Sequence, residues 1–438
     1  MTQAEVHLLV CGTVYTGDAA NTVIADGGVA VAGDTIVAVD SAATLKARYP
    51  QAQVVSCGER GLVMPGLINA HCHSPMTLLR GLADDLPLME WLTEHIFPRE
   101  GRFTAEIVDL GTRLAALEMI KGGTTSFCDM YLFAKDVARA ASDCGMRAWV
   151  GEVLYDFPSP NYGELENGFA YVAEMYDEFA GHPLVTVTAN AHAVYSCSSE
   201  LLVRLKQQAD DHASPFVIHL AETKGEVEGC LAKFGKRPVA HLADLGLLDE
   251  RLVADHCVAL NSEEIETLAR KGVKVAHCPE SNMKLASGVA PVAEMLAAGV
   301  TVGLGTDGAA SNNDLDMFGE MDSGAKLQKV HNLDPTLLTA PQVLAMATSG
   351  GATLLGAADA IGSLEVGKKA DIIVLDLDKP HLTPLYNIPS LLVYAASGAD
   401  VVHSVIGGRL LMENRQVLSL DEVEIMARCQ EMADRLRG

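Results

Sequence analysis

Residues 66–73 read Gly-Leu-Ile-Asn-Ala-His-Cys-His, a short apolar run that ends in two histidines. The run Gly66–Ala70 predicts a buried β-strand. Successive side chains on a strand point to opposite faces, so His71 and His73 point the same way. Both imidazoles can therefore reach one metal ion. An isolated His-x-His pair does not establish a metal site, so the neighbouring strands have to be considered.

Further apolar runs follow, with helical stretches between them. They are Thr124–Cys128, Arg147–Val150, Leu184–Ala189, Phe216–Ile218, Leu252–Ala254, Val273–Ala276 and Thr301–Leu304. Eight short strands that alternate with helices predict an α/β fold, a parallel (β/α)8 barrel of the TIM type. Because the spacing of the runs is irregular, an open doubly wound sheet is the alternative.

Side chains that can bind metals recur where these strands end. The later strands end at or just before the following residues: His192, His219 with Glu222 after it, His256, His277 and Asp307. In a parallel barrel these positions face one mouth, where the chemistry of the fold occurs. Three imidazoles and one carboxylate suit Zn²⁺ or Fe²⁺. His219 and Asp307 could therefore complete a site begun by the first strand.

The number of metal ions can also be predicted. A lysine at the end of the fourth strand would allow a carbamylated bridge between two ions. No Lys or Arg occurs between Arg147 and Arg204. We therefore expect one divalent metal, zinc in the first place, with iron as the alternative.

The two ends of the chain resemble each other and differ from the middle. Both contain short β-type runs separated by Gly-rich turns: His7–Val10, Gly28–Val31, Thr35–Val39, Ala370–Leu375, Val401–Ile406 and Arg409–Met412. We expect residues 1–61 and 366–438 to build one small β-sandwich domain. The barrel would occupy residues 62–365, and a terminal helix would cover about Leu420–Leu436.

Composition excludes several classes of partner. The formal net charge is −25, and an acidic surface repels phosphate backbones, so we expect no nucleic acid partner. No apolar stretch reaches the roughly 18 residues of a membrane span, so we expect no membrane insertion. Residues Met1–Leu9 lack the order of a signal peptide, which predicts a cytoplasmic location. The ten scattered cysteines predict reduced thiols.

Four ordered motifs resemble the amidohydrolase family over nearly the whole chain. They are Val63–His73, His219–Thr223, Gly305–Gly308 and Gly362–Asp376. A narrower segment is similar to the 5-methylthioadenosine/S-adenosylhomocysteine deaminase branch: Met76–Gly81, Asp85-Leu86, Trp91-Leu92 and Glu100. Related branches such as guanine deaminases, cytosine deaminases and triazine hydrolases share the metal motifs and are the alternative. A non-enzymatic scaffold is disfavoured because every expected ligand is present.

The resemblance implies a metal-dependent hydrolysis that releases ammonia from an adenosine-type nucleoside. The implied metal ligands are His71, His73, His219 and Asp307. Glu222 would carry a proton to ring nitrogen N1, and Asp307 would take a proton from water. His256 would orient the attacking oxygen or the developing charge. In the alternative reading, Glu222 is a surface carboxylate and His256 a core histidine, while His277 could simply pack near the mouth.

Glu100, His192 and Trp91 are the predicted substrate contacts besides Glu222. A carboxylate at Glu100 can accept two hydrogen bonds from the 2′- and 3′-hydroxyls of ribose, which free bases and triazines lack. His192 would contact the ribose or the purine, and Trp91 would wall the pocket. Each could instead be ordinary: Glu100 a solvated charge, Trp91 a core aromatic.

The 5′ substituent should decide selectivity. S-adenosylhomocysteine carries a carboxylate that Arg would normally bind, yet the loops after the third and fourth strands contain no Lys or Arg. Apolar surface could instead come from Met76, Leu88, Met89 and Phe97. We therefore predict 5′-methylthioadenosine as the preferred substrate, with S-adenosylhomocysteine and adenosine as further possibilities. The resemblance also implies a homo-oligomer.

Overall fold

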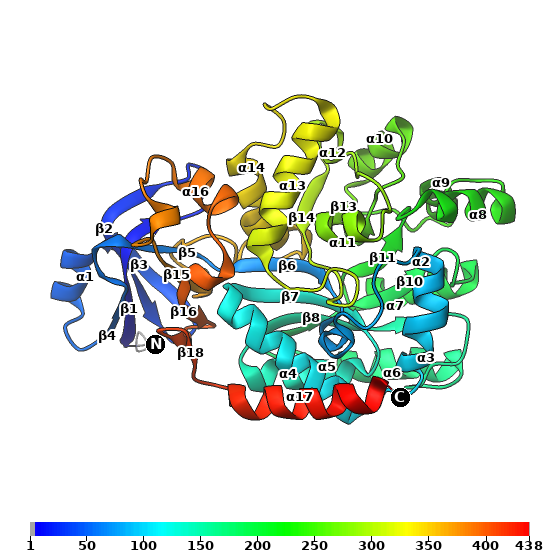
Figure 1. Cartoon of the computed structure of the whole chain (residues 1–438), viewed down its shortest axis with the longest axis horizontal. Helices are drawn as coiled ribbons and strands as arrows, with labels where there is room; N and C mark the ends of the chain where they lie inside the picture. Colours follow the sequence, from blue (N-terminus) through cyan, green and yellow to red (C-terminus); the bar gives the residue numbers. More distant parts are fainter. Residues whose placement is uncertain (1–4, 438) are drawn as a thin grey trace.

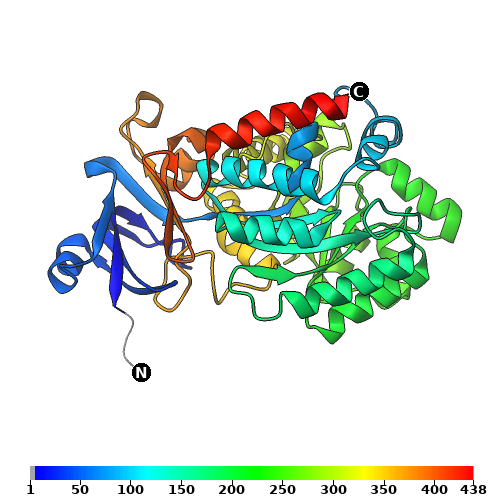
Figure 2. The same ribbon diagram turned by 90° about the horizontal axis from the view of Figure 1, so that it is seen from below.

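Two sheets organise the chain (Figure 1). The computed structural model describes residues 5–437; residues 1–4 and 438, which belong to the predicted end segments, lie outside the described part. The middle of the chain forms a parallel barrel, and strands from both ends form a separate sheet beside it. Figure 2 shows the same arrangement from below, with the end sheet at one side of the barrel.

The barrel contains the strands that the sequence predicts. They are β6 (Leu67–Cys72), β7 (Thr124–Tyr131), β8 (Arg147–Leu154), β10 (Ala189–Ala193), β11 (Phe216–Leu220), β12 (Leu252–His256), β13 (Lys274–His277) and β14 (Thr301–Leu304), with β9 (Val185–Val187) beside β8. Every residue of β7 and β8 is buried. Such continuous burial is expected for parallel strands that lie inside a layer of helices.

The last barrel strand meets the first. Cys72 and Asp307 form a parallel bridge, and the Asp307 N–H donates to the His71 carbonyl at 3.0 Å. These contacts join the segment after β14 to β6. The predicted (β/α)8 barrel is therefore confirmed, and the open sheet is excluded.

Helices follow the barrel strands and surround them (Figure 1). They are α4 (Ala105–Gly122), α5 (Ala134–Cys144), α6 (Leu165–Glu178), α7 (Ser199–Asp211), α8 (Lys224–Phe234), α9 (Pro238–Asp244), α10 (Ser262–Lys271), α11 (Pro279–Lys284), α12 (Val292–Ala297), α13 (Met317–Asn332), α14 (Ala340–Ala345) and α15 (Gly351–Leu354), with the π-helical turn η4 (Met346–Gly350). Local sequence sets their ends: α10 begins with an Asn261–Glu264 capping box and ends at the left-handed Gly272.

The long connection between β6 and α4 covers the mouth of the barrel. It contains the 3₁₀ helix η2 (Ser74–Leu79), the turns α2 (Leu88–Glu90) and α3 (Phe97–Glu100), and the π-helical turn η3 (Trp91–Ile96). π-helical turns are rare and often occur at functional sites. We call residues 74–100 the cover segment.

Both chain ends contribute to the second sheet. Its strands are β1 (Val6–Tyr15), β2 (Val23–Ala32), β3 (Thr35–Ser41), β4 (Gln53–Ser56), β5 (Gly61–Pro65), β15 (Ile372–Asp376), β16 (Val401–Ile406), β17 (Arg409–Glu413) and β18 (Gln416–Val417). Antiparallel pairing of β5 with β15 joins the two ends. Val10, Val29, Val374 and Val405 are fully buried in one shared cluster, so strands from both ends enclose a common core.

Short helices complete the chain. They are α1 (Ala42–Arg48), η1 (Gly58–Arg60), η5 (Pro380–Leu382), α16 (Ile388–Tyr394), η6 (Gly398–Asp400) and the terminal α17 (Glu422–Arg437). Helix α17, drawn in red, runs alongside α4 in both views (Figures 1 and 2), and Lys121 bonds to Glu422 at 2.6 Å. Helix α17 lies close to its predicted bounds.

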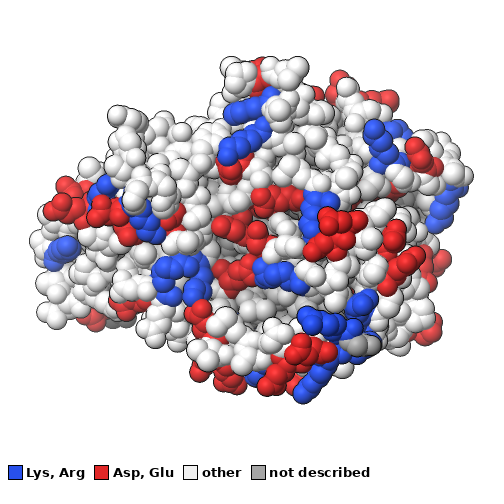
Figure 3. Space-filling view, viewed as in Figure 1, with Lys and Arg blue, Asp and Glu red and all other residues white. Residues whose placement is uncertain are grey.

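Within residues 5–437 no helix has the length and hydrophobicity that a membrane span requires. Acidic and basic side chains are interspersed on the face in Figure 3.

Candidate active site

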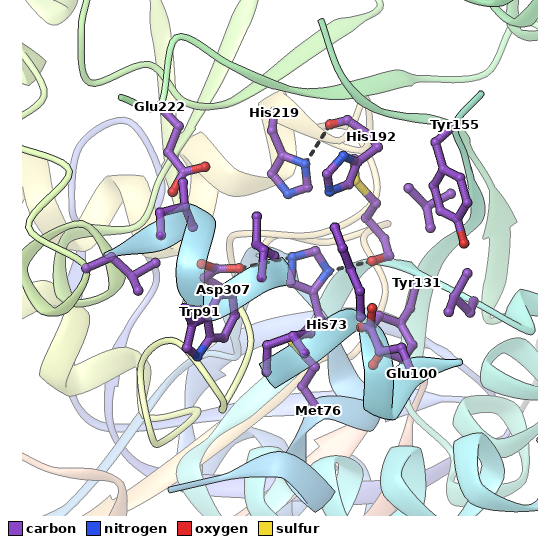
Figure 4. Close-up of a pocket in the computed structure, with 18 of the residues that line it drawn as sticks. His73, Met76, Trp91, Glu100, Tyr131, Tyr155, His192, His219, Glu222 and Asp307 are labelled. Atoms are coloured by element: carbon purple, nitrogen blue, oxygen red, sulfur yellow. Dashed lines mark hydrogen bonds and ion pairs between the residues drawn. The ribbon is translucent and has the colours of Figure 1, made fainter. Parts of the chain in front are cut away.

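The carboxyl ends of the barrel strands surround a cavity. Its lining contains most of the residues that the sequence predicts for the site: His73, Trp91, Glu100, His192, His219, Glu222, His256 and Asp307 (Figure 4). His71, the remaining one, is fully buried beside the cavity. Side chains that are far apart in the sequence are therefore brought to one place by the register of the barrel.

The predicted metal ligands converge. The His73 Nε2 atom lies 3.0 Å from Asp307 Oδ1, and His71 Nε2 lies 3.5 Å from the same oxygen. The ring centroids of His71 and His219 are 5.0 Å apart. His71, His73 and His219 each place a ligand atom within 4.8 Å of the others. The group His71, His256 and Asp307 meets the same distance limit, so His256 adjoins the cluster as well.

The donor set fits a divalent metal. Nε2 of His71 is buried and makes no hydrogen bond to the described residues, and Asp307 Oδ1 lies 3.5 Å from it. Leaving a buried polar atom unpaired costs about 1–3 kcal/mol, so such atoms usually have a ligand. Imidazole nitrogens and a carboxylate oxygen are the donors that Zn²⁺ binds most often. The residues present can therefore hold the predicted ion.

Neighbouring groups fix which atoms face the cluster. The Nδ1 atom of His73 bonds to the Met130 carbonyl, and that of His219 bonds to the His192 carbonyl at 2.7 Å. Both rings therefore direct Nε2 toward the cluster, as metal-binding histidines require. Asp307 is held in the same way, because its Oδ2 accepts hydrogen bonds from two serines, at 2.6 and 2.8 Å: Ser281 and Ser311.

Asp255 is a contact that the sequence interpretation missed. Its Oδ2 lies 3.0 Å from His71 Nδ1, and both side chains are completely buried. A carboxylate behind a metal-binding imidazole orients the ring and raises its basicity. One signal in the sequence was available. Asp255 is an acidic residue between the apolar run Leu252–Ala254 and His256.

Glu222 lies in the cavity at the side of Asp307 (Figure 4). The carboxylate of Glu226 accepts hydrogen bonds from the N–H groups of Ala221 and Glu222, at 3.0 and 2.8 Å. This contact fixes the backbone that carries Glu222. Burial raises the pKa of the Glu222 carboxyl, which favours its protonated form. Ser287 Oγ approaches it at 3.5 Å.

His256 and His277 differ in their surroundings. The ring of His256 lines the cavity, and its Nδ1 bonds to Asn282 Oδ1 at 3.0 Å. His277 is fully buried and is not part of the cavity lining. Asn282 is a second residue that sequence interpretation missed; it stands in α11, directly after Ser281.

Glu100 faces the cavity from the opposite side. It lies beside Tyr131, whose hydroxyl is buried (Figure 4). Burial raises the pKa of Glu100, while the nearby Tyr131 opposes this shift. Burial also lowers the pKa of His192 to about 4, so that ring is neutral; its Nδ1 lies 2.7 Å from Ser196 Oγ.

The predicted apolar surface is only partly present. Met76, Leu88 and Phe97 line the cavity, as does Trp91 from the π-helical turn. Met89 does not: it is 55% exposed and lies outside the lining. The expectation for Met89 was wrong, because in the turn α2 it follows Leu88 directly and so points to another side.

Comparison with known proteins decides the family. The profile of the amidohydrolase family matches residues 62–411. This chain belongs to the amidohydrolase family. A shorter match, to an imidazolonepropionase-like composite domain of bacteria, covers residues 27–52 in the end sheet.

Relatives of this amidohydrolase cover almost its full length. It is 53% identical to a 5-methylthioadenosine/S-adenosylhomocysteine deaminase of Syntrophobacter fumaroxidans, over 97% of each chain. A crystal structure of an adenosine deaminase from Xanthomonas campestris with bound zinc is similar with a TM-score of 0.97 and 41% identity, over 99% of each chain. A crystal structure of atrazine chlorohydrolase TrzN from Arthrobacter aurescens TC1, complexed with zinc, is similar with a TM-score of 0.90 and 25% sequence identity. The match covers 97% of this chain and 100% of the other.

These likenesses confirm the predicted enzyme class. This amidohydrolase is a hydrolase that acts on carbon–nitrogen bonds. Metal dependence belongs to the family, and the cluster around His71 supplies the donors for it. Which metal is bound and which residue plays which part are matters for the proposal below.

Proposed function

We propose that this amidohydrolase removes the 6-amino group of adenosine-type nucleosides, with 5′-methylthioadenosine as the preferred substrate. The observation that carries the proposal is the placement of Glu100. This buried carboxylate faces the same cavity as Glu222 and the proposed metal ligands, on the opposite side (Figure 4). A vicinal diol is the natural partner for such a carboxylate, and nucleosides provide one. The names of the relatives support the same class of substrate.

One zinc ion is part of the proposal, with iron as the alternative. The proposed ligands are His71, His73, His219 and Asp307. When bound, a divalent ion lowers the pKa of water to about 7 and so supplies hydroxide at neutral pH.

Proton transfer is assigned to two carboxyl groups. Glu222, whose pKa is raised by burial, gives a proton to N1 while the oxygen of water adds to C6. Asp307 takes one proton from that water and passes it to the leaving amino group. The C6–N bond then breaks and ammonia leaves, while the C6 hydroxyl returns a proton to Glu222. The products are the 6-oxo nucleoside and ammonia.

The other proposed residues position the substrate. His256, held through its Nδ1 by Asn282, orients the attacking oxygen. Glu100 binds the 2′- and 3′-hydroxyls, and the neutral ring of His192 contacts the ribose or the purine. Trp91 forms a wall of the cavity.

The alternative function is that of another heterocycle hydrolase, such as a guanine deaminase, a cytosine deaminase or a triazine hydrolase. The structural similarity to atrazine chlorohydrolase is the reason to consider it.

Ammonia release should be measured with adenosine, 5′-methylthioadenosine, guanine, cytosine and atrazine. We expect turnover of the two nucleosides. Glu100→Ala should lower their kcat/KM about 10²-fold, as expected for two charge-assisted hydrogen bonds. It should hardly affect 2′,3′-dideoxyadenosine, which lacks the diol. Turnover confined to free bases or triazines would overturn the proposal.

The wider organisation is proposed as the sequence predicts it. We propose that residues 1–61 and 366–438 form the small domain and residues 62–365 the catalytic domain, except that β5 (Gly61–Pro65) pairs in the end sheet. We propose a cytoplasmic homo-oligomer without a nucleic acid partner. Light scattering of the purified protein as it elutes from a size-exclusion column measures the oligomeric state. A monomeric mass would contradict the proposed homo-oligomer.

A further inference from the structure

One end of the cavity is aromatic, and the proposed chemistry does not use it. The rings of Tyr155 and Phe157 are stacked, with centroids 3.9 Å apart and planes at 18°. Phe97, from the cover segment, lies 5.9 Å from Phe157. Phe97 and Tyr155 both approach the ring of His192, at 6.2 and 6.3 Å between centroids. Two loops therefore meet in one aromatic group, which we call the aromatic rim: Phe97, Tyr155 and Phe157. Phe97 and Tyr155 line the cavity, whereas Phe157 is outside the lining and stacks on Tyr155.

The aromatic rim lies at the ribose side of the proposed site. In Figure 4, Tyr155 stands on the same side of His73 as Glu100, whereas Glu222 stands on the other side. The charge of Glu100 also contributes to a raised pKa of Tyr155, after the larger effect of burial, so the two groups are near each other. If Glu222 meets the purine and Glu100 meets the ribose hydroxyls, the 5′ carbon points toward this end.

Of the apolar side chains predicted from the sequence, Phe97 belongs to the aromatic rim, whereas Leu88 and Trp91 lie elsewhere. Leu88 also lines a surface groove that contains Ser287, the residue whose hydroxyl approaches Glu222. Trp91 is likewise on the Glu222 side of the cavity (Figure 4). These side chains are therefore placed to contact the base, and they are poorly placed for a 5′ substituent.

The rim has no cation that could pair with the carboxylate of an amino-acid tail. Among the described residues that line the cavity there is no Lys or Arg. The loop that follows β8, residues 155–164, contains none either. A carboxylate brought here would lack a cation and would lie near Glu100, so its desolvation would not be compensated.

We propose that Phe97, Tyr155 and Phe157 form a subsite for an uncharged 5′-thioether group and determine which nucleoside is preferred. The inference rests on the proposed function. Sulfur of a thioether makes favourable contacts with aromatic rings, and an alkyl group gains from leaving water. S-adenosylhomocysteine offers the same sulfur but adds an amino-acid tail whose carboxylate the rim cannot pair.

The test measures a ratio of kcat/KM values for each variant, with adenosine as the reference substrate. The other substrates are 5′-methylthioadenosine, S-adenosylhomocysteine and 5′-butylthioadenosine, whose long uncharged tail separates size from charge. Phe157 is 40% exposed, so Phe157→Ala should fold. We expect it to lower the ratio of 5′-methylthioadenosine to adenosine about tenfold, because Tyr155 loses the ring that is stacked against it. Phe157→Leu should recover part of this loss. Met89→Ala is the matched control, because Met89 is likewise exposed and outside the lining but does not belong to the aromatic rim; it should leave the ratio unchanged.

Phe157→Arg adds the missing cation. We expect it to raise the ratio of S-adenosylhomocysteine to 5′-methylthioadenosine about tenfold, as one new charge-assisted contact would. In the wild type, 5′-butylthioadenosine should be turned over better than S-adenosylhomocysteine. Equal turnover of these two, or ratios that Phe157→Ala and Phe157→Arg leave unchanged, would overturn the subsite while adenosine turnover still supports the proposed function. A wild type that deaminates no nucleoside overturns both.

Discussion

Glu222 illustrates how one residue is prepared for its role by its surroundings. Glu226 holds the backbone on both sides of the Ala221–Glu222 peptide, and burial raises the pKa of Glu222. Glu222→Gln keeps the shape and removes the exchangeable proton. We predict that kcat falls about 10²- to 10⁴-fold, the usual range for loss of a general acid or base.

The measurement for Glu222→Gln combines kinetics with elemental analysis of bound metal. Metal content and KM should stay near those of the wild type, because Glu222 is not among the proposed ligands. The control is Glu228→Gln, an exposed position on the following helix. A fall in kcat that is matched by loss of metal would assign Glu222 to the ligand set instead.

Glu152 gives a pH dependence of stability. This buried residue of β8 accepts a hydrogen bond from the Ala134 N–H at 2.8 Å. Burial nevertheless raises the pKa of Glu152 from 4.5 to about 8. The folded state therefore holds this proton more tightly than the unfolded state. The contribution of Glu152 to stability is complete below about pH 4.5 and is lost as the pH rises to about 8.

Glu152→Gln should remove this pH dependence. We predict that the Tm difference between pH 5 and pH 8.5 is smaller in the variant than in the wild type. Exposed Glu164 in the neighbouring loop offers the control Glu164→Gln, which should keep the wild-type difference. Identical pH profiles for Glu152→Gln and the wild type would contradict the assignment.

Single residues also set the limit of what the sequence could predict. His71, His73 and His219 were recognisable because polar residues at the ends of apolar runs stand out. Tyr131 and Tyr155 were not, because an aromatic residue in a buried strand or loop is ordinary until its neighbours are known. Their importance comes from packing across strands, which no local pattern records.

At the scale of elements, the apolar runs predicted where the barrel strands lie, but they predicted the first and last residues of the strands less accurately. The strand Thr301–Leu304 was predicted with its observed bounds. The first strand was predicted to stop at Ala70 but continues to Cys72, because His71 takes part in the barrel register. The run Leu184–Ala189 divides into β9 and β10, a break that hydrophobicity does not indicate.

The cover segment was the least predictable element. Its short 3₁₀, α and π turns have no sustained period, and they are stabilised by contacts with the barrel mouth rather than by local propensity. It nevertheless supplies Trp91 and Glu100 to the cavity. Resemblance to a family identified these two residues, whereas periodicity could not.

Helix α11 acts as one positioning element for two proposed catalytic residues. Its Ser281 donates to Asp307 at 2.6 Å, and its Asn282 bonds to His256 at 3.0 Å. Because Asn282 fixes the His256 ring, we predict that Asn282→Ala lowers kcat about tenfold and leaves KM nearly unchanged, the pattern of a lost transition-state contact. Asn282→Asp keeps the accepting oxygen and should restore most of the rate.

The control on the same helix is Met283→Ala, since Met283 is 42% exposed. It should change neither kcat nor KM. Thermal unfolding of all three variants separates a positioning effect from a loss of fold. A parallel increase of KM in Asn282→Ala would indicate that Asn282 acts on substrate binding.

At the scale of the whole molecule, the end sheet is continuous with the barrel. Strand β5 leads through Gly66 into β6, which carries His71. Pairing of β5 with β15 anchors the start of that strand to the C-terminal part of the chain. The sequence predicted that both ends share one sheet, because their β-type runs look alike. It could not predict which strands are neighbours, since that depends on contacts more than 300 residues apart.

A buried ion pair links the barrel to the end sheet. Arg147, at the start of β8, donates to both oxygens of Asp371, at 2.7 and 3.2 Å. Asp371 also accepts a hydrogen bond from the Gly407 N–H at 2.7 Å. The side chains are only 10% and 4% exposed. Removing one partner of such a pair leaves a buried charge uncompensated, which costs about 3–5 kcal/mol.

We predict that Arg147→Met lowers the free energy of unfolding in urea by about 3–5 kcal/mol. Adding Asp371→Asn should recover much of that loss, because asparagine removes the charge and can still accept from Gly407. The comparison is Arg204→Met, whose partner Glu166 is 73% exposed, so water compensates and the loss of stability should be far smaller than for Arg147→Met. If the two substitutions at Arg147 and Asp371 instead add their separate costs, the pair does not act as a unit. The contact between barrel and end sheet would then depend on packing around β5 and β15 rather than on charge.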